Sequence, residues 1–231
     1  TCALPICAES TGPTSSDVSV DEEWSRLLPA IRTVHRIAPT MKISIDTWKS
    51  AIAERAINEG VDLINDVTAG RGDPAMLSLL AGTKMPVVLL YSKDTSPRTT
   101  IDAREYENVV HTVNTFFIQR IDDALKQGIN LSSIIIDPGL GHFVSAIPSY
   151  SHELLDHLAL FKKLAPVMVS PARKSFLAGP EGHPPEQRLE ATVDANCRAI
   201  KNGALFIRTH DVGATRRAYQ QFIRRRRKPL L

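Results

Sequence analysis

Six short apolar runs, each closed by a polar residue, alternate along the chain with stretches of helical character. Buried strands of a parallel sheet are typically short, continuous and rich in β-branched residues, and alternation with helices predicts parallel pairing. We therefore expect an α/β fold of the (β/α)8 TIM-barrel type. The runs are residues 41–46 (MKISID), 61–66 (VDLIND), 86–92 (PVVLLYS), 133–137 (SIIID), 166–170 (PVMVS) and 204–210 (ALFIRTH).

The polar residues that close these runs predict a shared pocket. In a barrel of strand–helix units the carboxyl ends of all strands meet at one face, where binding and catalytic residues gather. Seven side chains are expected at this face: Asp46, Asn65, Tyr91, Asp137, Lys174 just beyond its strand, Arg208 and His210.

The number of strands predicts an incomplete barrel. A closed barrel needs eight strands in about 250 residues, whereas six runs are clear here and a seventh would end near Ala8. We expect one domain over residues 8–231 that lacks the first strand–helix unit of the barrel. Pro5 would block a ladder bond, and residues 2–6 have few β-branched side chains. Residues 1–7 are therefore expected to be disordered, or foreign sequence joined to a truncated reading frame.

Helices are expected between the runs, from hydrophobic spacing and end signals. Ser19 and Glu22 form a capping box that predicts the start of the first one. The expected helices cover residues 19–37, 49–58, 74–81, 103–127, 151–163, 185–202 and 214–224.

Composition excludes several classes of protein. Hydrophobic residues make up 43% and charged residues 23% of the 231 residues, as in soluble globular chains, and no apolar run approaches a membrane span. The net charge of +3 includes five positive charges at residues 224–228, so the rest of the chain carries −2 (+3 minus 5). That balance predicts no nucleic-acid surface. Three cysteines without metal or disulfide spacing favour a reducing, cytoplasmic location.

Six motifs at the predicted strand ends together resemble those of dihydropteroate synthase in order, placement and spacing. Each motif alone is weak, but six in register are specific, and the resemblance extends from about Ala8 to the last predicted strand. The motifs are residues 9–11 (EST), 44–47 (SIDT), 64–67 (INDV), 137–139 (DPG), 173–176 (RKSF) and 208–212 (RTHDV).

This resemblance implies a specific reaction and its requirements. The family condenses 6-hydroxymethyl-7,8-dihydropterin diphosphate with 4-aminobenzoate, which gives 7,8-dihydropteroate and pyrophosphate for folate synthesis. Mg²⁺ assists the family's reaction, and its members form homodimers. We accordingly expect a cytoplasmic transferase with small-molecule substrates, and no residue of this chain is assigned as a metal ligand.

The resemblance also implies roles for particular side chains. Asp46, Asn65 and Asp137 would read the polar edge of the pterin, and Lys174 would donate to its ring. The guanidinium of Arg208 would stack on the ring face. The expected catalytic residues are Asp46, Lys174, Arg208 and His210, and the expected substrate-binding residues are Thr11, Asp46, Asn65, Val67, Asp137, Lys174, Ser175, Arg208 and His210.

Five positions depart from the family's pattern. Gly12 stands where the family has an anion-binding Arg, and Ala172 stands where it has Ser before the Arg-Lys pair. Tyr91 and Ser92 replace a Met-His pair, and Val144 replaces a Lys. These changes predict a divergent pocket wall, and with truncation they predict that this fragment has impaired activity.

Two other functions stay open from the sequence. Similar barrels with the same pterin-reading residues transfer a methyl group from methyltetrahydrofolate to a corrinoid protein. The basic residues Lys174, Arg208 and His210 favour the synthase, because a diphosphate needs cationic ligands. A pterin-binding barrel without catalysis is the third reading, suggested by Gly12 and Val144.

Overall fold

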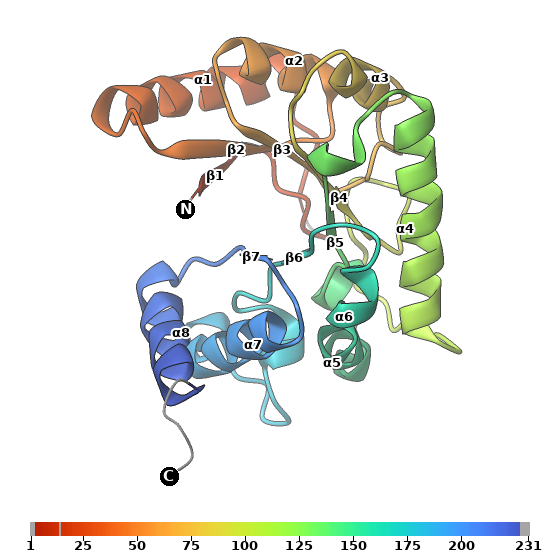
Figure 1. Cartoon of the computed structure of the whole chain (residues 1–231), viewed down its shortest axis with the longest axis vertical. Coiled ribbons are helices and arrows are strands. Elements are labelled where there is room, and N and C mark those ends of the chain that lie inside the picture. The colour runs from red at the N-terminus through yellow and green to blue at the C-terminus, as the bar shows by residue number, and fades with distance from the viewer. Residues whose placement is uncertain (1–2, 14, 227–231) are drawn as a thin grey trace. The chain divides into compact units, whose positions relative to one another are not determined.

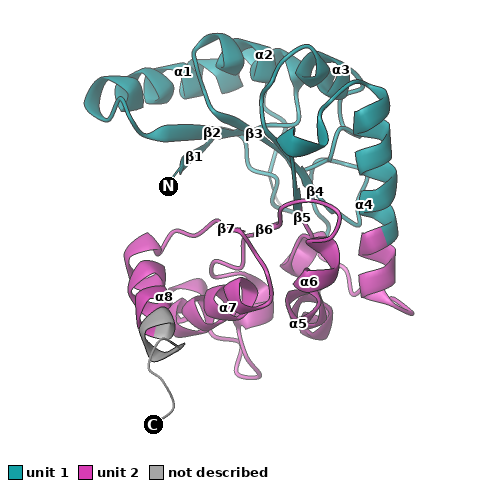
Figure 2. Ribbon diagram, viewed as in Figure 1, with its two compact units in different colours: residues 1–100, 115–136 teal, residues 101–114, 137–231 magenta. Residues whose placement is uncertain are grey.

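The computed structural model describes residues 3–13 and 15–226, with side chains as far as residue 221. The charge run at residues 224–228 therefore lies outside the described side chains. Two compact units make up the chain (Figure 2). Unit 1 contains residues 1–100 and 115–136, and unit 2 contains residues 101–114 and 137–231.

A five-stranded sheet forms the framework of unit 1. Its order is β1-β2-β3-β4-β5, the order of the chain, and the β1–β2, β2–β3 and β3–β4 pairs are parallel. The predicted α/β fold with parallel strands is thus confirmed. The strands are β1 (Ala3–Cys7), β2 (Lys42–Asp46), β3 (Leu63–Asp66), β4 (Val87–Leu90) and β5 (Ile134–Asp137).

Three helices lie side by side along the β1–β4 part of this sheet (Figure 1). They are α1 (Val20–Ile37), α2 (Ser50–Asn58) and α3 (Ala75–Ala81). Ser19 caps α1 as predicted, because its side chain accepts a hydrogen bond from the Glu22 amide at 3.2 Å. Fully buried Leu27 and Ile31 of α1 and Ile43 and Ile45 of β2 form part of the core.

Strand β1 corrects the expectation of disorder for residues 3–7, whereas residues 1–2 lie outside the described residues. Residues 3–7 pair in parallel with β2 at five positions, and Pro5 lies opposite Ser44. Proline is tolerated because β1 is the edge strand of the sheet, where one side of the backbone needs no partner. Most of β1 is exposed, so it does not need the β-branched residues of a buried strand.

Unit 2 alternates short strands with helices. Its two-stranded sheet pairs β6 (Met168–Val169) in parallel with β7 (Phe206–Ile207). The α-helices that follow β5 and flank these strands are α5 (Pro148–Asp156), α6 (Leu158–Phe161), α7 (Leu189–Lys201) and α8 (Val212–Arg226). The 3₁₀ turns near the expected site residues are η2 (Gly141–Phe143) and η3 (Ser175–Leu177).

Two expected helices have different bounds. Helix α4 (Val109–Lys126) begins six residues later than expected, since Asn108 accepts a hydrogen bond from the His111 amide at 2.8 Å. The preceding segment is held as a loop, in which the Tyr106 hydroxyl donates to the Val144 carbonyl at 2.8 Å. The helix expected over residues 151–163 starts at Pro148 and is divided into α5 and α6 at His157.

We predict that Asp73→Ala lowers the free energy of unfolding by about 1–2 kcal/mol, because one carboxylate caps two helices. It accepts hydrogen bonds from the amides of Ser50 at 2.7 Å and of Ala75 at 2.9 Å, at the starts of α2 and α3. Urea denaturation at neutral pH measures the change.

The exposed Asp122, which pairs with Lys126 within α4, provides a matched control. Asp122→Ala should change stability by less than about 0.5 kcal/mol. Burial opposes ionisation of Asp73, but the bonds from Ser50 and Ala75 lower its pKa below the usual value. The contribution of Asp73 to stability is therefore complete above the pKa that its carboxyl has in the unfolded chain. It is lost as the pH falls through the lower pKa of the folded chain. Equal stability of Asp73→Ala and the native chain at neutral pH would contradict the double cap.

Candidate active site

The ends of β2 and β3 bring two predicted site residues together in unit 1. Asp46 and Asn65 lie opposite each other in the register, and the Asn65 side-chain amide donates to the Asp46 carboxylate at 3.0 Å. Asn65 is only 5% exposed, and its Oδ1 is buried without a hydrogen-bond partner among the described residues. A buried acceptor of this kind is costly unless a ligand supplies a donor.

A pocket with an empty volume of about 290 Å³, part of it open to solvent, lies beside this pair. Thr11, Asp46 and Val67 line it, which places two further predicted residues next to Asp46. The residues that sequence reasoning did not assign to the pocket are Cys7, Glu9, Glu23, Thr47 and Trp48. The sequence could have indicated Glu9 as a pocket residue, because Glu9 begins the first of the six motifs.

The neighbouring Asp66 has a structural role. Successive strand residues face opposite sides, and the fully buried carboxylate of Asp66 organises the loop after β3. It accepts hydrogen bonds from the Thr68 amide at 2.8 Å, the Thr68 hydroxyl at 2.7 Å and the Gly70 amide at 2.6 Å. Burial raises the pKa of Asp66 to about 6 despite these bonds.

Unit 2 contains the predicted cationic residues. The Lys174 ammonium donates to the Leu140 carbonyl at 3.1 Å and lies 4.8 Å from the centre of the Phe143 ring. Burial lowers the pKa of Lys174 to about 8, the charge of Asp137 raises it and that of Arg208 lowers it further. Asp137, Lys174 and Arg208 are thus close enough to interact electrostatically. The Asp137 carboxylate also accepts from the Gly139 amide at 2.9 Å, so it forms the turn as well.

Arg173 fixes the loop that carries Lys174. Arg173 has a positive φ of 53°, and its amide donates to Thr192 of α7 at 3.0 Å. Its guanidinium binds both carboxylate oxygens of Asp211, at 2.8 and 3.0 Å. Arg173 therefore ties the Lys174 loop to the segment after β7, which carries Arg208 and His210.

Fewer side-chain contacts describe the other predicted residues of unit 2, which are Ser175, Arg208 and His210. The Arg208 amide donates to the Val169 carbonyl at 2.9 Å, which fixes the end of β7 beside β6. Ser175 opens η3. The His210 ring is exposed, and its charge contributes, after that of Arg173, to lowering the pKa of Asp211.

Two of the residues that depart from the expected pattern are in the core. Tyr91 is 4% exposed and packs edge-on against Phe116, with ring centres 5.0 Å apart. Val144 is fully buried and its carbonyl accepts the Tyr106 hydroxyl. The aromatic ring of Tyr91 is thus used in packing, and its place in the shared pocket stays a prediction.

Comparison with known proteins identifies the family. The family of pterin binding enzymes matches residues 3–210. A dihydropteroate synthase of Synechocystis sp. is 33% identical over 213 residues, which cover 91% of this chain and 72% of the relative. The dihydropteroate synthase of Xanthomonas albilineans with 4-aminobenzoic acid is 35% identical, with a TM-score of 0.88 over 98% of this chain and 80% of that one. The chain belongs to the dihydropteroate synthase family.

The Xanthomonas albilineans synthase has also been solved in complex with 7,8-dihydropteroate. The Xanthomonas albilineans dihydropteroate synthase in complex with 7,8-dihydropteroate is 33% identical, with a TM-score of 0.84, and covers 98% of this chain and 82% of that one. The predicted family is thus confirmed. The roles given to single residues, and the convergence of the residues of the two units on one substrate, stay predictions.

The described residues meet neither the requirements of a metal site nor those of a membrane-spanning helix. The described residues contain no group of three or more His, Cys, Asp or Glu side chains that could hold a metal ion. None of the helices in the described part of the chain has both the length and the apolar character that crossing a bilayer requires.

We predict that pterin binding weakens as the pH rises through about 8, because Lys174 then loses the proton with which it would donate to the ligand. Titration of the chain with the pterin substrate across pH 6.5–9.5 measures this dependence. In Asp137→Asn the midpoint should move to lower pH, since the charge of Asp137 raises the pKa of Lys174. A midpoint unchanged in this variant would contradict the coupling of the two groups.

Proposed function

We propose that this chain catalyses the condensation of 6-hydroxymethyl-7,8-dihydropterin diphosphate with 4-aminobenzoate to 7,8-dihydropteroate and pyrophosphate. The observation that carries the proposal is the Asp46–Asn65 pair beside a pocket lined by Thr11. This arrangement occurs in a chain that is 35% identical to a synthase solved with 4-aminobenzoic acid. The substrates are small molecules, and no role for nucleic acid or membrane is proposed.

The polar groups predicted for the substrate site are of the kinds that a pterin requires. Its edge presents alternating N–H donors and nitrogen or oxygen acceptors. This edge would exchange hydrogen bonds with Asp46, Asn65 and Asp137. A site built from such groups rejects molecules that lack the matching donors and acceptors. Lys174 would donate to the ring, and the planar guanidinium of Arg208 would stack on its face.

The same residues suit an early break of the bond to the leaving group. The bond between the exocyclic methylene carbon and the diphosphate oxygen breaks, and its electron pair leaves with the diphosphate. The carboxylate of Asp46 would stabilise the cation that remains, while Arg208 and His210 would hold the anion. The amine of 4-aminobenzoate, placed by Thr11 and Ser175, then attacks the methylene carbon and loses a proton.

We propose Mg²⁺ only as an ion that binds together with the diphosphate of the substrate. Mg²⁺ keeps most of its waters and commonly binds through one or two carboxylates and substrate phosphates. We therefore propose that the ion arrives with the substrate. The ion would neutralise charge on the departing diphosphate.

We also propose a homodimer in a reducing cytoplasm. Large apolar side chains remain exposed in the last strand and helix of unit 2, as expected for a protein surface that is covered by a second subunit. These side chains are Leu205, Phe206, Val212 and Tyr219. Cys197 is a free cysteine, which suits a compartment that keeps cysteines reduced.

Formation of 7,8-dihydropteroate tests the activity directly. The purified chain, mixed with the dihydropterin diphosphate, 4-aminobenzoate and Mg²⁺, should form dihydropteroate and pyrophosphate in equal amounts. Chromatography of the product and a pyrophosphate assay measure both. Tight pterin binding without any product would show a binding barrel instead, and methyl transfer from methyltetrahydrofolate to a corrinoid protein would show the alternative enzyme.

Substitutions at the two units test the pterin site separately. We predict that Asp46→Asn and Lys174→Ala each weaken pterin binding by roughly 10- to 100-fold, because each removes a charged hydrogen-bond partner worth about 1.5–3 kcal/mol. Calorimetric titration measures the affinity. The exposed Lys42, which pairs with Asp62 at 2.7 Å, supplies the control Lys42→Ala, which should bind normally. Native affinity in both site variants would refute the assigned pocket.

A further inference from the structure

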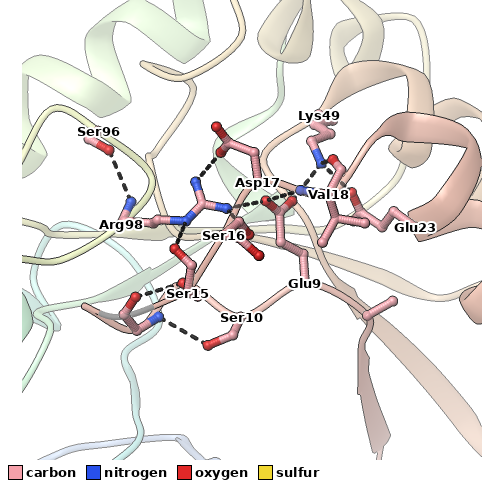
Figure 3. Close-up of polar contacts among 12 residues, drawn as sticks. Glu9, Ser10, Ser15, Ser16, Asp17, Val18, Glu23, Lys49, Ser96 and Arg98 are labelled. Atoms are coloured by element: carbon pink, nitrogen blue, oxygen red, sulfur yellow. Dashed lines mark hydrogen bonds and ion pairs between the residues drawn. The ribbon is translucent and has the colours of Figure 1, made fainter.

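A cluster of buried charges in unit 1 lies beside the pocket but has no role in the proposed reaction (Figure 3). Its centre is Glu9, which is 5% exposed and lies two residues after the end of β1. One carboxylate oxygen accepts from Lys49 at 2.5 Å, and the other accepts from Arg98 at 2.6 Å. Both carboxylate oxygens of Glu9 are thus engaged by cations.

Arg98 uses three of its nitrogens to hold the segment of residues 9–17. Besides Glu9, its guanidinium donates to the carbonyls of Ser15 at 3.0 Å and Ser16 at 2.7 Å, and it binds the carboxylate of Asp17. A planar guanidinium with several N–H donors in fixed directions is suited to such a contact, whereas an ammonium is not. The Arg98 contacts therefore fix the path of the segment at both ends.

The next residue extends the same connection to the pocket. The Thr99 amide donates to the Thr11 carbonyl at 3.2 Å. Thr11 lines the pocket together with Asp46, and Thr99 is 4% exposed. Residues 98 and 99 thus hold the pocket-lining segment by both its side chains and its backbone.

Lys49 completes the support from the opposite side. Its ammonium donates to Glu9, to the Val18 carbonyl at 2.6 Å and to Glu23 at 2.7 Å, which uses all three of its protons. Burial opposes ionisation of Glu9, but hydrogen bonds and charge from Lys49 and Arg98 lower its pKa below the usual value. The carboxylate of Glu9 therefore stays ionised at neutral pH.

We infer that Arg98 and Glu9 are positioning residues that clamp the segment of residues 9–17, so that Thr11 faces the aminobenzoate side of the pocket. This inference rests on the proposed function, because it assigns the clamped segment to the second substrate. Arg98 acts through the segment and does not bind substrate, since Nε and both terminal nitrogens already donate to protein oxygens. Gly12 adds no side chain of its own to hold the segment, which makes the external clamp necessary.

Kinetics of Arg98→Ala test the clamp. The KM for 4-aminobenzoate should rise at least tenfold, whereas the Kd for the dihydropterin diphosphate, measured without 4-aminobenzoate, should stay within twofold. Arg98→Lys keeps the charge but loses the planar guanidinium, so the KM for 4-aminobenzoate should rise less than in Arg98→Ala. The control Arg32→Ala removes an exposed Arg–Glu pair of the same unit, the two-bond contact with Glu59, and should change neither constant.

Hydrogen exchange tests the same clamp without any activity. The backbone amides of residues 15–18 should exchange at least tenfold faster in Arg98→Ala than in the native chain, and those of β3 should not change. If Arg98→Ala does not fold, Arg98→Lys decides by the same two measurements. An unchanged KM for 4-aminobenzoate, an equal loss of pterin affinity, or unchanged exchange in the segment would overturn the inference. A native chain that makes no dihydropteroate would instead refute the proposed function, and exchange would still decide the clamp.

Discussion

A single buried ammonium connects the parts of unit 1 on which the pocket depends. Lys49 stands at the start of α2 and binds Glu23 in the first turn of α1 and Glu9 at the end of β1. Removing one partner from such a buried group is costly, by about 3–5 kcal/mol, because the remaining charges lose their compensation. The edge strand β1 has little buried surface of its own, so this ionic connection, together with pairing to β2, holds it in register.

Parallel pairing then decides which polar groups meet. Cys7, Asp46 and Asn65 lie at the same level on three neighbouring strands, so the register brings these residues together. The strand period gives the next residue, Asp66, the opposite direction and a different role, the support of a loop. The adjacent residues Asn65 and Asp66 therefore have different roles: Asn65 belongs to the predicted site, and Asp66 supports a loop.

The sequence predicted this framework well because its signals are local. Uninterrupted apolar runs predicted β2 to β5, and Ser19 predicted the start of α1. It did not predict β1, because Pro5 and the scarcity of β-branched residues argued against a buried strand, whereas β1 is an exposed edge strand. It also did not predict that Glu9, Lys49 and Arg98 meet, since 40 and 89 residues separate Glu9 from its two partners and only the fold brings them together.

The pocket is built at a cost in stability that a ligand can recover. The Asn65 Oδ1 is buried without a partner among the described residues, which costs about 1–3 kcal/mol. In unit 2, burial and the nearby charge of Arg208 make the ammonium of Lys174 less favourable than in water. In unit 1, a ligand that brings an N–H donor to Asn65 would relieve the first cost. In unit 2, a ligand that brings an acceptor to Lys174 would reduce the second. An apolar molecule of the same shape gains neither contribution to its affinity.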